Sequence, residues 1–469
     1  MPKKCLVIVP HPDDEINIAG SLFGVLDQND FFTYVAMISY GDYYPKMASV
    51  RCKEAQKAQE VLGYDTLFFL GYGDDYNGCH IYDAEKLQEV KSHSGRIETF
   101  DVNGIKTYHR QKTGEQCRYT RGNLKNDIKS LLMDLKADIL VCVDVDNHPD
   151  HKALSLLFDE VIGEILKETV YRPIILKKFA YLGVYKGPND FYKNSDNFTL
   201  PCFFNVLDEK LSYPYLWDDR LRIPTPNGDI QLQFWKTKLY RALHAHRSQR
   251  AISKFGRIVN DDIVYWLRRV DSLTYTAKLL VSSGDQRYLN DFKIVDTDDI
   301  RNSSPLIIPS ERNVWKPCKE DKEPTITFLL DASSTISCIV IYQNLLSSIE
   351  RCRIETDNGF NEVFDIQNSY QIHLDLPKLK GVSNIKITFL VANNLAINEI
   401  EIYSERNVKI DAFLQDMVHE EKTVGKKDNS KWQLSLCKNI YSLVLLYVWL
   451  QRLHERIHRK ILKLIQNNI

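Results

Sequence analysis

Hydrophobic and polar residues alternate along the first 185 residues in the manner of an α/β domain. Short β-branched apolar runs predict strands, and the longer segments between them repeat apolar residues every three or four positions, which predicts helices. This alternation predicts a mostly parallel, Rossmann-like sheet with helices on both faces. The predicted strands are Lys4–Val9, Phe32–Ser39, Thr66–Leu70, Asp138–Asp144 and Pro173–Leu182, and the predicted helices are Ile16–Leu26, Lys46–Leu62 and Asn123–Lys136.

From about residue 290 the pattern changes to short runs with two-residue alternation, separated by turn signals such as Asp-Asn-Gly. Ile385, Ile387, Phe389 and Val391 would share one face of a half-buried strand. Several such runs in succession predict an antiparallel β-sandwich with a jelly-roll-like arrangement. The seven runs are Thr325–Leu330, Ile336–Tyr342, Arg351–Thr356, Glu362–Ile366, Tyr370–Leu376, Asn384–Val391 and Ala396–Tyr403.

Length and composition agree with a multidomain globular protein. The chain has 469 residues, of which 44% are hydrophobic and 26% charged, so two or three domains are expected. We predict an α/β domain over residues 1–289, a β-sandwich over 290–405 and a helical tail over 406–469. The net charge of −1 gives no reason to expect nucleic-acid binding.

The cysteines and the apolar segments of the sequence indicate in which cellular compartment the protein is found. The ten cysteines occur singly without a Cys-x-x-Cys pair, which is typical of reduced thiols. The N-terminus does not resemble a signal peptide, and no run of about 18 apolar residues predicts a spanning helix. We therefore expect a cytoplasmic protein.

The tail is strongly basic. Residues 422–469 contain ten Lys or Arg residues against Asp428 and Glu455, a net charge of +8. Apolar residues recur at three- to four-residue spacing from Leu443 to Leu464, with Arg and Lys between them. Such a basic amphipathic helix could lie on an anionic membrane at the inner face, form a short coiled coil in an oligomer, or pack on its own protein.

Two short polar motifs follow predicted strands. His11-Pro12-Asp13-Asp14-Glu15 follows the first strand, and His148-Pro149-Asp150-His151 follows the fourth. In a 3-2-1-4-5 strand order these strands are neighbours, so the two loops would face each other where α/β folds bind ligands. A hydrolytic zinc needs three protein ligands and an open position for water, and His and Asp are suitable ligands. One carboxylate of the Asp pair can bind metal while the other faces the water.

These motifs together resemble the PIG-L (LmbE-like) family of metal-dependent de-N-acetylases. Further similarity lies in an Arg51-x-x-Glu-Ala helix that ends in Leu-Gly, in Leu70-Gly-x-x-Asp74, in the segment 245–249 and in Trp266–Ser272. The resemblance extends over about three-fifths of the chain. It implies that the α/β domain removes an acyl group from an amino sugar.

The resemblance also implies roles for individual residues. Asp13 would be the general base, and His148 would stabilise the oxyanion or protonate the leaving amine. Asp150 would orient a histidine. The implied metal ligands are His11, Asp14 and His151, with Zn²⁺ as the expected ion, although iron or cobalt would also suit an Asp/His₂ set.

Three further residues are candidates for substrate binding. Arg51 would contact a sugar hydroxyl or phosphate, or be a helix-surface arginine. Asp74 would contact a sugar hydroxyl, or be a turn residue. His246 would line the pocket, or be a structural histidine.

The predicted function is the zinc-dependent removal of the N-acetyl group from an N-acetylglucosamine-type sugar or glycoconjugate, in cell-surface glycan or glycoconjugate biosynthesis. The alternatives are an amidase for another acylated amine, and a glycan-binding scaffold with an inactive hydrolase domain. The 290–405 segment resembles discoidin-like, galactose-binding sandwiches, which implies either carbohydrate binding or a packing or oligomerisation role.

Overall fold

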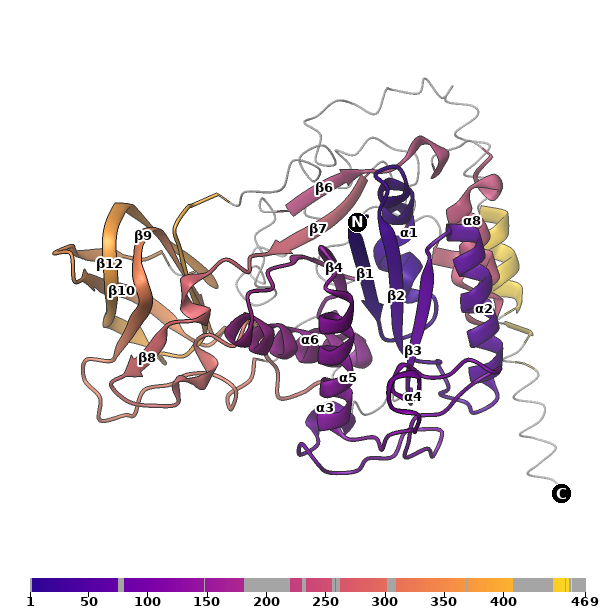
Figure 1. The fold of residues 1–469 in the computed structure, drawn as a ribbon, viewed down its shortest axis with the longest axis horizontal. Helices are drawn as coiled ribbons and strands as arrows, with labels where there is room; N and C mark the ends of the chain where they lie inside the picture. Colours follow the sequence, from indigo (N-terminus) through magenta and orange to yellow (C-terminus); the bar gives the residue numbers. More distant parts are fainter. Residues whose placement is uncertain are drawn as a thin grey trace.

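The fold in the computed structural model is an α/β domain joined to an all-β region (Figure 1). The structure is described for residues 2–74, 80–146, 148–180, 220–229, 233–254, 258, 262–301, 309–367, 369–407, 442–451, 453–454 and 457.

A seven-stranded sheet with the order β3-β2-β1-β4-β5-β7-β6 forms the centre of the α/β domain. The first five strands of this order are parallel, and β7 and β6 add antiparallel at one edge. The predicted neighbourhood of the first and fourth strands is therefore confirmed. The two antiparallel strands β6 and β7 were not predicted from the sequence. The strands are β1 (Lys4–Val9), β2 (Phe32–Ser39), β3 (Thr66–Tyr72), β4 (Ile139–Val143), β5 (Ile174–Lys178), β6 (Arg220–Pro224) and β7 (Asp262–Arg268).

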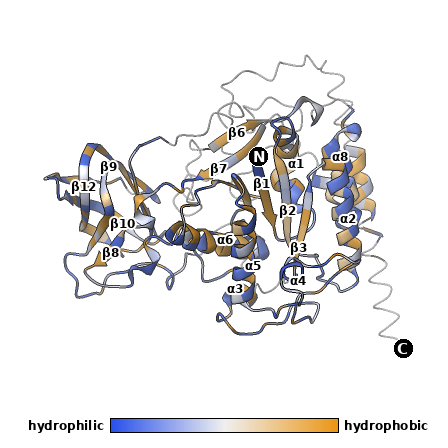
Figure 2. Cartoon of the chain, in the orientation of Figure 1, coloured by the Kyte–Doolittle hydropathy of each residue, from blue (hydrophilic) through white to orange (hydrophobic). Residues whose placement is uncertain are grey.

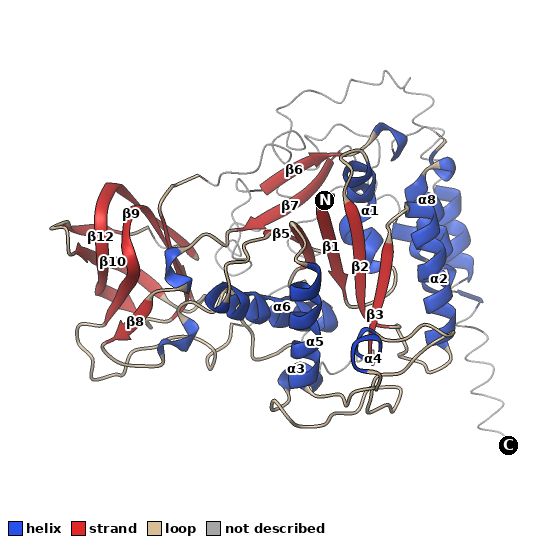
Figure 3. Ribbon diagram, in the orientation of Figure 1, coloured by secondary structure: helices blue, strands red, loops and turns tan. Residues whose placement is uncertain are grey.

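Helices cover both faces of this sheet, as predicted. Figure 3 shows α1, α2 and α8 on one side and α5 and α6 on the other. The longest helix, α6, was not predicted, although it follows directly from the second motif. The helices are α1 (Asp14–Asp27), α2 (Met47–Leu62), α3 (His80–Asp83), α4 (Tyr108–Thr113), α5 (Arg121–Leu135), α6 (Pro149–Glu168) and α8 (Lys238–Ala245).

The main hydrophobic core lies between the sheet and these helices. All residues of β4 are buried, and so are all residues of β1 after Lys4. Central strands of a parallel sheet are covered on both faces, which explains their continuous apolar sequence. In Figure 2 most of β1 has the colour of apolar residues, whereas α2 alternates between apolar and polar residues. The core thus fixes the carboxyl ends of β1 and β4, where both motifs begin.

The all-β region is an antiparallel sheet that folds around a second core. Its order is β11-β10-β12-β9-β13, and β8 pairs with β9. Two pairs of the predicted short runs are each one long strand, because the chain bends through register shifts and at Gly381 (φ +73°) instead of ending. The strands are β8 (Lys278–Val281), β9 (Thr325–Gln343), β10 (Ser348–Thr356), β11 (Asn361–Asp365), β12 (Gln371–Asn393) and β13 (Ile397–Tyr403).

The segment before the predicted boundary at residue 289 takes part in both halves. β8 precedes this boundary and pairs with β9, and Leu279 belongs to the second core. Arg268 at the end of β7 pairs with Glu401 of β13 at 3.2 Å between Nη1 and Oε1. The boundary itself stays a prediction.

The tail is described only in part. Residues 442–451 form a helix, which Figure 1 shows in yellow beside α8. Most of the predicted 406–469 segment, including Ile461, Leu464 and the basic residues from Arg452 onward, lies outside the described residues. None of the described helices combines the length and apolar content that a membrane crossing requires.

Candidate metal centre

The two motifs meet at the carboxyl ends of neighbouring strands. β1 leads through His11 and Asp13 into α1, and β4 leads through Asp146 to His148, the N-cap residue of α6. Because β1 pairs in parallel with β4 up to Ile8 and Cys142, both loops leave the same edge of the sheet. Residues 137 positions apart in sequence are thereby brought into contact.

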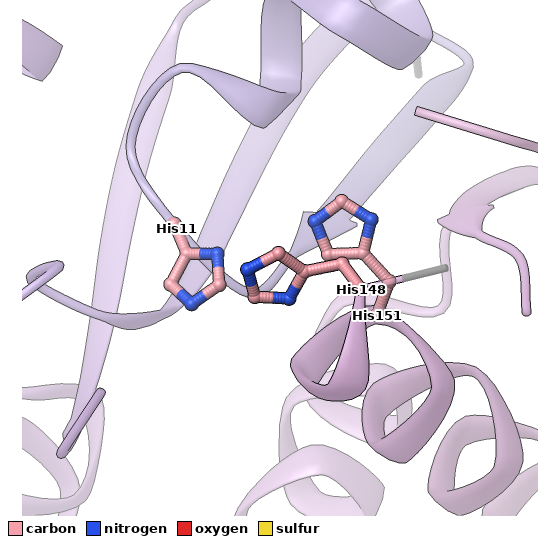
Figure 4. A group of neighbouring side chains, drawn as sticks. All are labelled: His11, His148 and His151. Carbon is pink, nitrogen blue, oxygen red and sulfur yellow. The ribbon is translucent and has the colours of Figure 1, made fainter. Parts of the chain in front are cut away.

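Two of the predicted metal ligands, His11 and His151, converge on a carboxylate oxygen of the third, Asp14. Oδ2 of Asp14 lies 3.2 Å from Nδ1 of His11 and 3.1 Å from Nε2 of His151. Asp14 and His151 are fully buried and His11 is 5% exposed. The rings of His11, His148 and His151 face one another (Figure 4), with ligand nitrogens within 4.8 Å. Two imidazole nitrogens and one carboxylate, converging from two loops, fit the donor set of a catalytic zinc site.

In both His11 and His151, the ring nitrogen that does not face Asp14 contacts a second carboxylate. Oδ2 of Asp146 lies 2.8 Å from Nδ1 of His151, and Oδ2 of Asp150 lies 2.9 Å from Nε2 of His11. Such outer carboxylates fix the ring orientation and the tautomer of a ligating histidine. Asp150 therefore contacts His11, and its role of orienting a histidine stays a prediction.

Electrostatics at this cluster favour a cation. Burial would lower the pKa of His11, but Asp74, Asp14 and Asp150 raise it well above its ordinary value. Burial likewise opposes protonation of His151, but Asp146 and Asp14 raise its pKa to about 9. The surplus of carboxylates that attracts protons to these rings would equally attract a divalent metal ion, which displaces such protons when it binds.

Asp13 stands beside this cluster in an unusual backbone conformation. Its φ of +98° lies in the left-handed region that non-glycine residues rarely adopt. Its backbone N–H donates to Glu15 Oε2 at 2.8 Å. Two cations hold its carboxylate, because Lys254 Nζ lies 3.0 Å from Oδ2 and Arg51 Nη2 lies 3.5 Å from Oδ1. Strained backbone of this kind is found where surrounding contacts fix a functional side chain.

His148 caps α6 and has a defined tautomer. Its Nδ1 accepts the backbone N–H of Asp150 at 3.2 Å, so in the neutral ring the proton lies on Nε2. Burial, together with the neighbouring His151 and His11, lowers the pKa of His148 to about 3. A neutral imidazole with a proton on Nε2 can donate a hydrogen bond to developing negative charge.

Arg51 is not a surface arginine. It is 7% exposed, and Nη2 donates to the Pro12 carbonyl at 2.5 Å. The guanidinium packs against Gly41, where an added Cβ would lie 2.2 Å from Nη1 at a φ of +66°. Arg51 therefore positions the Asp13 loop, and its contact with substrate stays a prediction.

Asp74 and His246 each lie close to a residue of the first motif. Asp74 is buried, and Oδ1 lies 3.8 Å from Nε2 of His11. His246 is fully buried, and Nε2 lies 2.8 Å from Oε1 of Glu15. Both residues thus contact the HPDDE loop, and their contacts with substrate also stay predictions.

Three side chains of the site were missed by the sequence analysis. The sequence could have indicated two of them: Asp146 follows a buried strand, and Glu15 is the last residue of the first motif. Lys254 had no such indication, since it reaches Asp13 across 241 residues from a short 3₁₀ helix.

A small cavity of about 50 Å³ borders the cluster behind His11 and Asp150. Its walls are mainly apolar and come from the ends of β1, β2 and β3 and from α3, α5 and α6, including Ile38, Leu124 and Leu157.

Comparison with known proteins identifies part of the chain. Residues 6–162 match the PIG-L family, described as GlcNAc-PI de-N-acetylase. This match contains both motifs, and these residues form a PIG-L family domain. No curated protein matches the chain.

Solved structures with similarity to the chain are of two kinds. N,N'-diacetylchitobiose deacetylase from Pyrococcus horikoshii is 16% identical with a TM-score of 0.32, over 57% of this chain and 84% of that one. A conserved protein from Thermus thermophilus is 14% identical with a TM-score of 0.30, over 56% and 93%. A fucose-binding module from Streptococcus pneumoniae is 21% identical with a TM-score of 0.23, over 29% and 99%.

Proposed function

We propose that this protein, which carries a PIG-L family domain at residues 6–162, is a zinc-dependent hydrolase that removes the N-acetyl group from an N-acetylglucosamine-type sugar or glycoconjugate. The observation that carries the proposal is the convergence of His11, Asp14 and His151 beside Asp13, within the segment that matches a de-N-acetylase family. Cell-surface glycan or glycoconjugate biosynthesis is the proposed setting.

His11, Asp14 and His151 would hold the metal, since their ligand atoms converge from both loops. When bound, a divalent ion supplies polarisation of the amide carbonyl and an acidified water. The carboxylates of the buried Asp146 and the half-buried Asp150 keep the two rings turned toward Asp14.

Asp13 is the proposed general base. Lys254 and Arg51 fix the direction of its carboxylate, so that it can accept a proton from the water that attacks the carbonyl carbon. The C–N bond then breaks, and the amine nitrogen takes up this proton as it leaves. His148 would donate a hydrogen bond from Nε2 to the oxygen that becomes negative when the carbonyl is attacked.

Acetate release from purified protein tests this function. The substrates are free, nucleotide-linked, lipid-linked and polymeric N-acetylhexosamines, with N-acylated amines that are not sugars as comparison. We expect Asp13→Asn to retain metal but to lose about 10²–10⁴-fold in acetate release, because the general base is gone. His151→Ala should lose the metal itself, as measured by elemental analysis after dialysis.

The matched control is Asp27→Asn at the exposed end of α1, which should behave as the unaltered protein. Absence of bound divalent metal, or full activity of Asp13→Asn, would refute the proposal. Release from non-sugar amides alone would instead assign an amidase. The predicted cytoplasmic location is a separate proposal, which fractionation of cells that produce the protein tests.

A further inference from the structure

The C-terminal helix at 442–451 exposes an unusual amount of apolar surface. Leu443, Trp449 and Leu450 are 64%, 56% and 49% exposed. Most other large apolar side chains among the described residues are buried or half-buried in one of the cores. Exposed apolar surface that is concentrated on one element marks an interaction site. The exposed apolar residues of the helix and of the described positions after it are Leu443, Leu446, Tyr447, Trp449, Leu450, Leu453 and Ile457.

The opposite side of this helix already has its packing partner. Val448 is 4% exposed, and Leu445 packs against the main core. Together with Tyr240 and Leu243 of α8, the helix also lines a cavity of about 410 Å³. The helix is therefore docked on its own protein through the side of Leu445 and Val448. The exposed Leu443 and Tyr447 lie at the edge of this contact and line the cavity, whereas Leu446, Trp449 and Leu450 do not.

The exposed residues form a stripe. Positions 443, 446, 450, 453 and 457 recur at three- and four-residue spacing, which places residues on one side of a helix. We call these five positions the outer stripe. Tyr447 and Trp449 flank it, and their side chains suit a boundary where one end is apolar and the other is wet.

The positive charge of residues 422–469 indicates which kind of partner the outer stripe binds. The sequence from 422 to 469 has a net charge of +8, and Arg452 and Arg456 directly precede Leu453 and Ile457. A second copy of the chain would bring an equal positive charge against it, and like charges across an interface are unfavourable. An anionic lipid surface supplies both the negative charge and the apolar phase.

We propose that the outer stripe binds the surface of an anionic membrane, with the helix lying in the headgroup region. The helix packs beside α8, and His246, just after α8, bonds to Glu15 of the candidate site. Membrane binding would thus hold the α8 side of the α/β domain toward the bilayer. This inference does not depend on the proposed reaction.

Vesicle flotation of the full-length protein tests it. We expect the protein to float with vesicles of phosphatidylcholine and phosphatidylglycerol, and far less with phosphatidylcholine alone. High salt should weaken the binding because it screens the basic tail. Leu446→Ser/Leu450→Ser/Leu453→Ser should reduce the floated fraction about tenfold or more, because three apolar side chains no longer enter the bilayer.

A matched control removes equally exposed apolar residues from the all-β region. Leu280, Leu346 and Val363 are 46%, 56% and 50% exposed, and their combined change to serine should leave flotation unchanged. Both variants should keep the thermal midpoint of the unaltered protein, since the substituted side chains are exposed.

Three outcomes would overturn the inference. One is equal flotation of the stripe variant and its control, and another is equal flotation with anionic and neutral vesicles. The third is a dimer in sedimentation velocity that the stripe variant abolishes without any lipid binding, which would assign the stripe to a second copy. Acetate release from a soluble substrate should be the same in all variants, which keeps this test separate from that of the reaction.

Discussion

At the scale of single residues, the candidate site depends on carboxylates that do not themselves reach the centre. Asp146 is the best example, because it is fully buried and serves three groups. Oδ2 lies 2.8 Å from Nδ1 of His151 and accepts the N–H of Ala180 at 3.1 Å, and Oδ1 accepts the N–H of His148 at 2.9 Å. One side chain thus fixes the ring of a proposed ligand and the start of α6.

We therefore expect Asp146→Asn to weaken metal binding. An amide of the same size removes the negative charge behind His151, and outer partners of this kind typically contribute about 10–100-fold to metal affinity. Competition with a chelating dye measures the dissociation constant for Zn²⁺. Asp27→Asn, on the exposed end of α1, should bind the ion as tightly as the unaltered protein. An unchanged dissociation constant for Asp146→Asn would show that His151 needs no such support.

The residues at the centre were predictable and several of their supports were not. His11, Asp14 and His151 belong to short motifs that follow apolar strands, so the local sequence marked them as candidates, and the structure brings them together. Lys254 is held near Asp13 only by the folding of a distant segment, and a lone lysine in a polar stretch has no local signal. For Arg51 the sequence left open a substrate contact or a position on the helix surface, because the burial of a helix arginine depends on the loop that packs over it.

At the scale of elements, α6 couples the second motif to the all-β region. His148 is its N-cap residue, and Gly163 in its C-terminal half packs against the backbone of Asp291. At Gly163 an added Cβ would lie 2.3 Å from the backbone oxygen of Asp291. Only glycine permits so close an approach without a shift of backbone.

Gly163→Ala should therefore destabilise the protein although alanine favours helix. The clash with backbone costs about 1–3 kcal/mol, and the gain in helix propensity is at most about 1 kcal/mol. We expect a lower midpoint of thermal unfolding, measured by differential scanning fluorimetry. In the matched change Gly24→Ala on α1, the nearest atom is a side-chain carbon of Pro226 at 3.2 Å, so its midpoint should fall less or rise. Equal midpoints for the two variants would mean that the Asp291 segment yields freely.

Elements of the α/β domain were more predictable than those of the all-β region. β1 and β2 have the predicted bounds, because each is a short apolar run between polar segments. β9 and β12 were each divided in two by the sequence analysis, since polar residues interrupt their alternation. The chain continues through these interruptions by bulges that keep the pairing with the neighbouring strand, and bulges of this kind have no reliable sequence signal.

At the scale of the whole molecule, the two cores are joined by buried charged residues of β13. Glu399 and Glu401 are 0% and 1% exposed, although they alternate with apolar residues as a solvent-facing half of a strand would. Arg268 of β7 pairs with Glu401, and the N–H of Phe292 donates to Oε2 of Glu399 at 3.1 Å. The alternation in the sequence could not reveal this burial, because it depends on how the two domains pack.

The protonation of Glu399 should make this junction sensitive to pH. Burial raises the pKa of Glu399 well above its ordinary value, the carboxylates of Asp291 and Glu401 raise it further, and Arg268 and Lys167 only partly oppose this. No group among the described residues bonds to Oε1. A carboxyl whose pKa is raised on folding stabilises the protein below the pKa of the unfolded state, about 4.3. This contribution is lost as the pH rises through the pKa of the folded state.

Glu399→Gln should accordingly flatten the decline of stability with pH. Glutamine stays neutral, so the thermal midpoint of the variant relative to the unaltered protein should rise over the pH range above the pKa of the unfolded carboxyl, about 4.3. Glu362→Gln on β11 is the control, because this carboxylate is exposed and its loss should leave the decline unchanged. Differential scanning fluorimetry across this range measures all three proteins, and each keeps the same metal-binding residues, so their contribution cancels. If the thermal midpoints of all three proteins declined equally with pH, the ionisation of Glu399 would not reduce the stability of the folded state. Water would then have to reach this carboxylate through a local separation of the two cores.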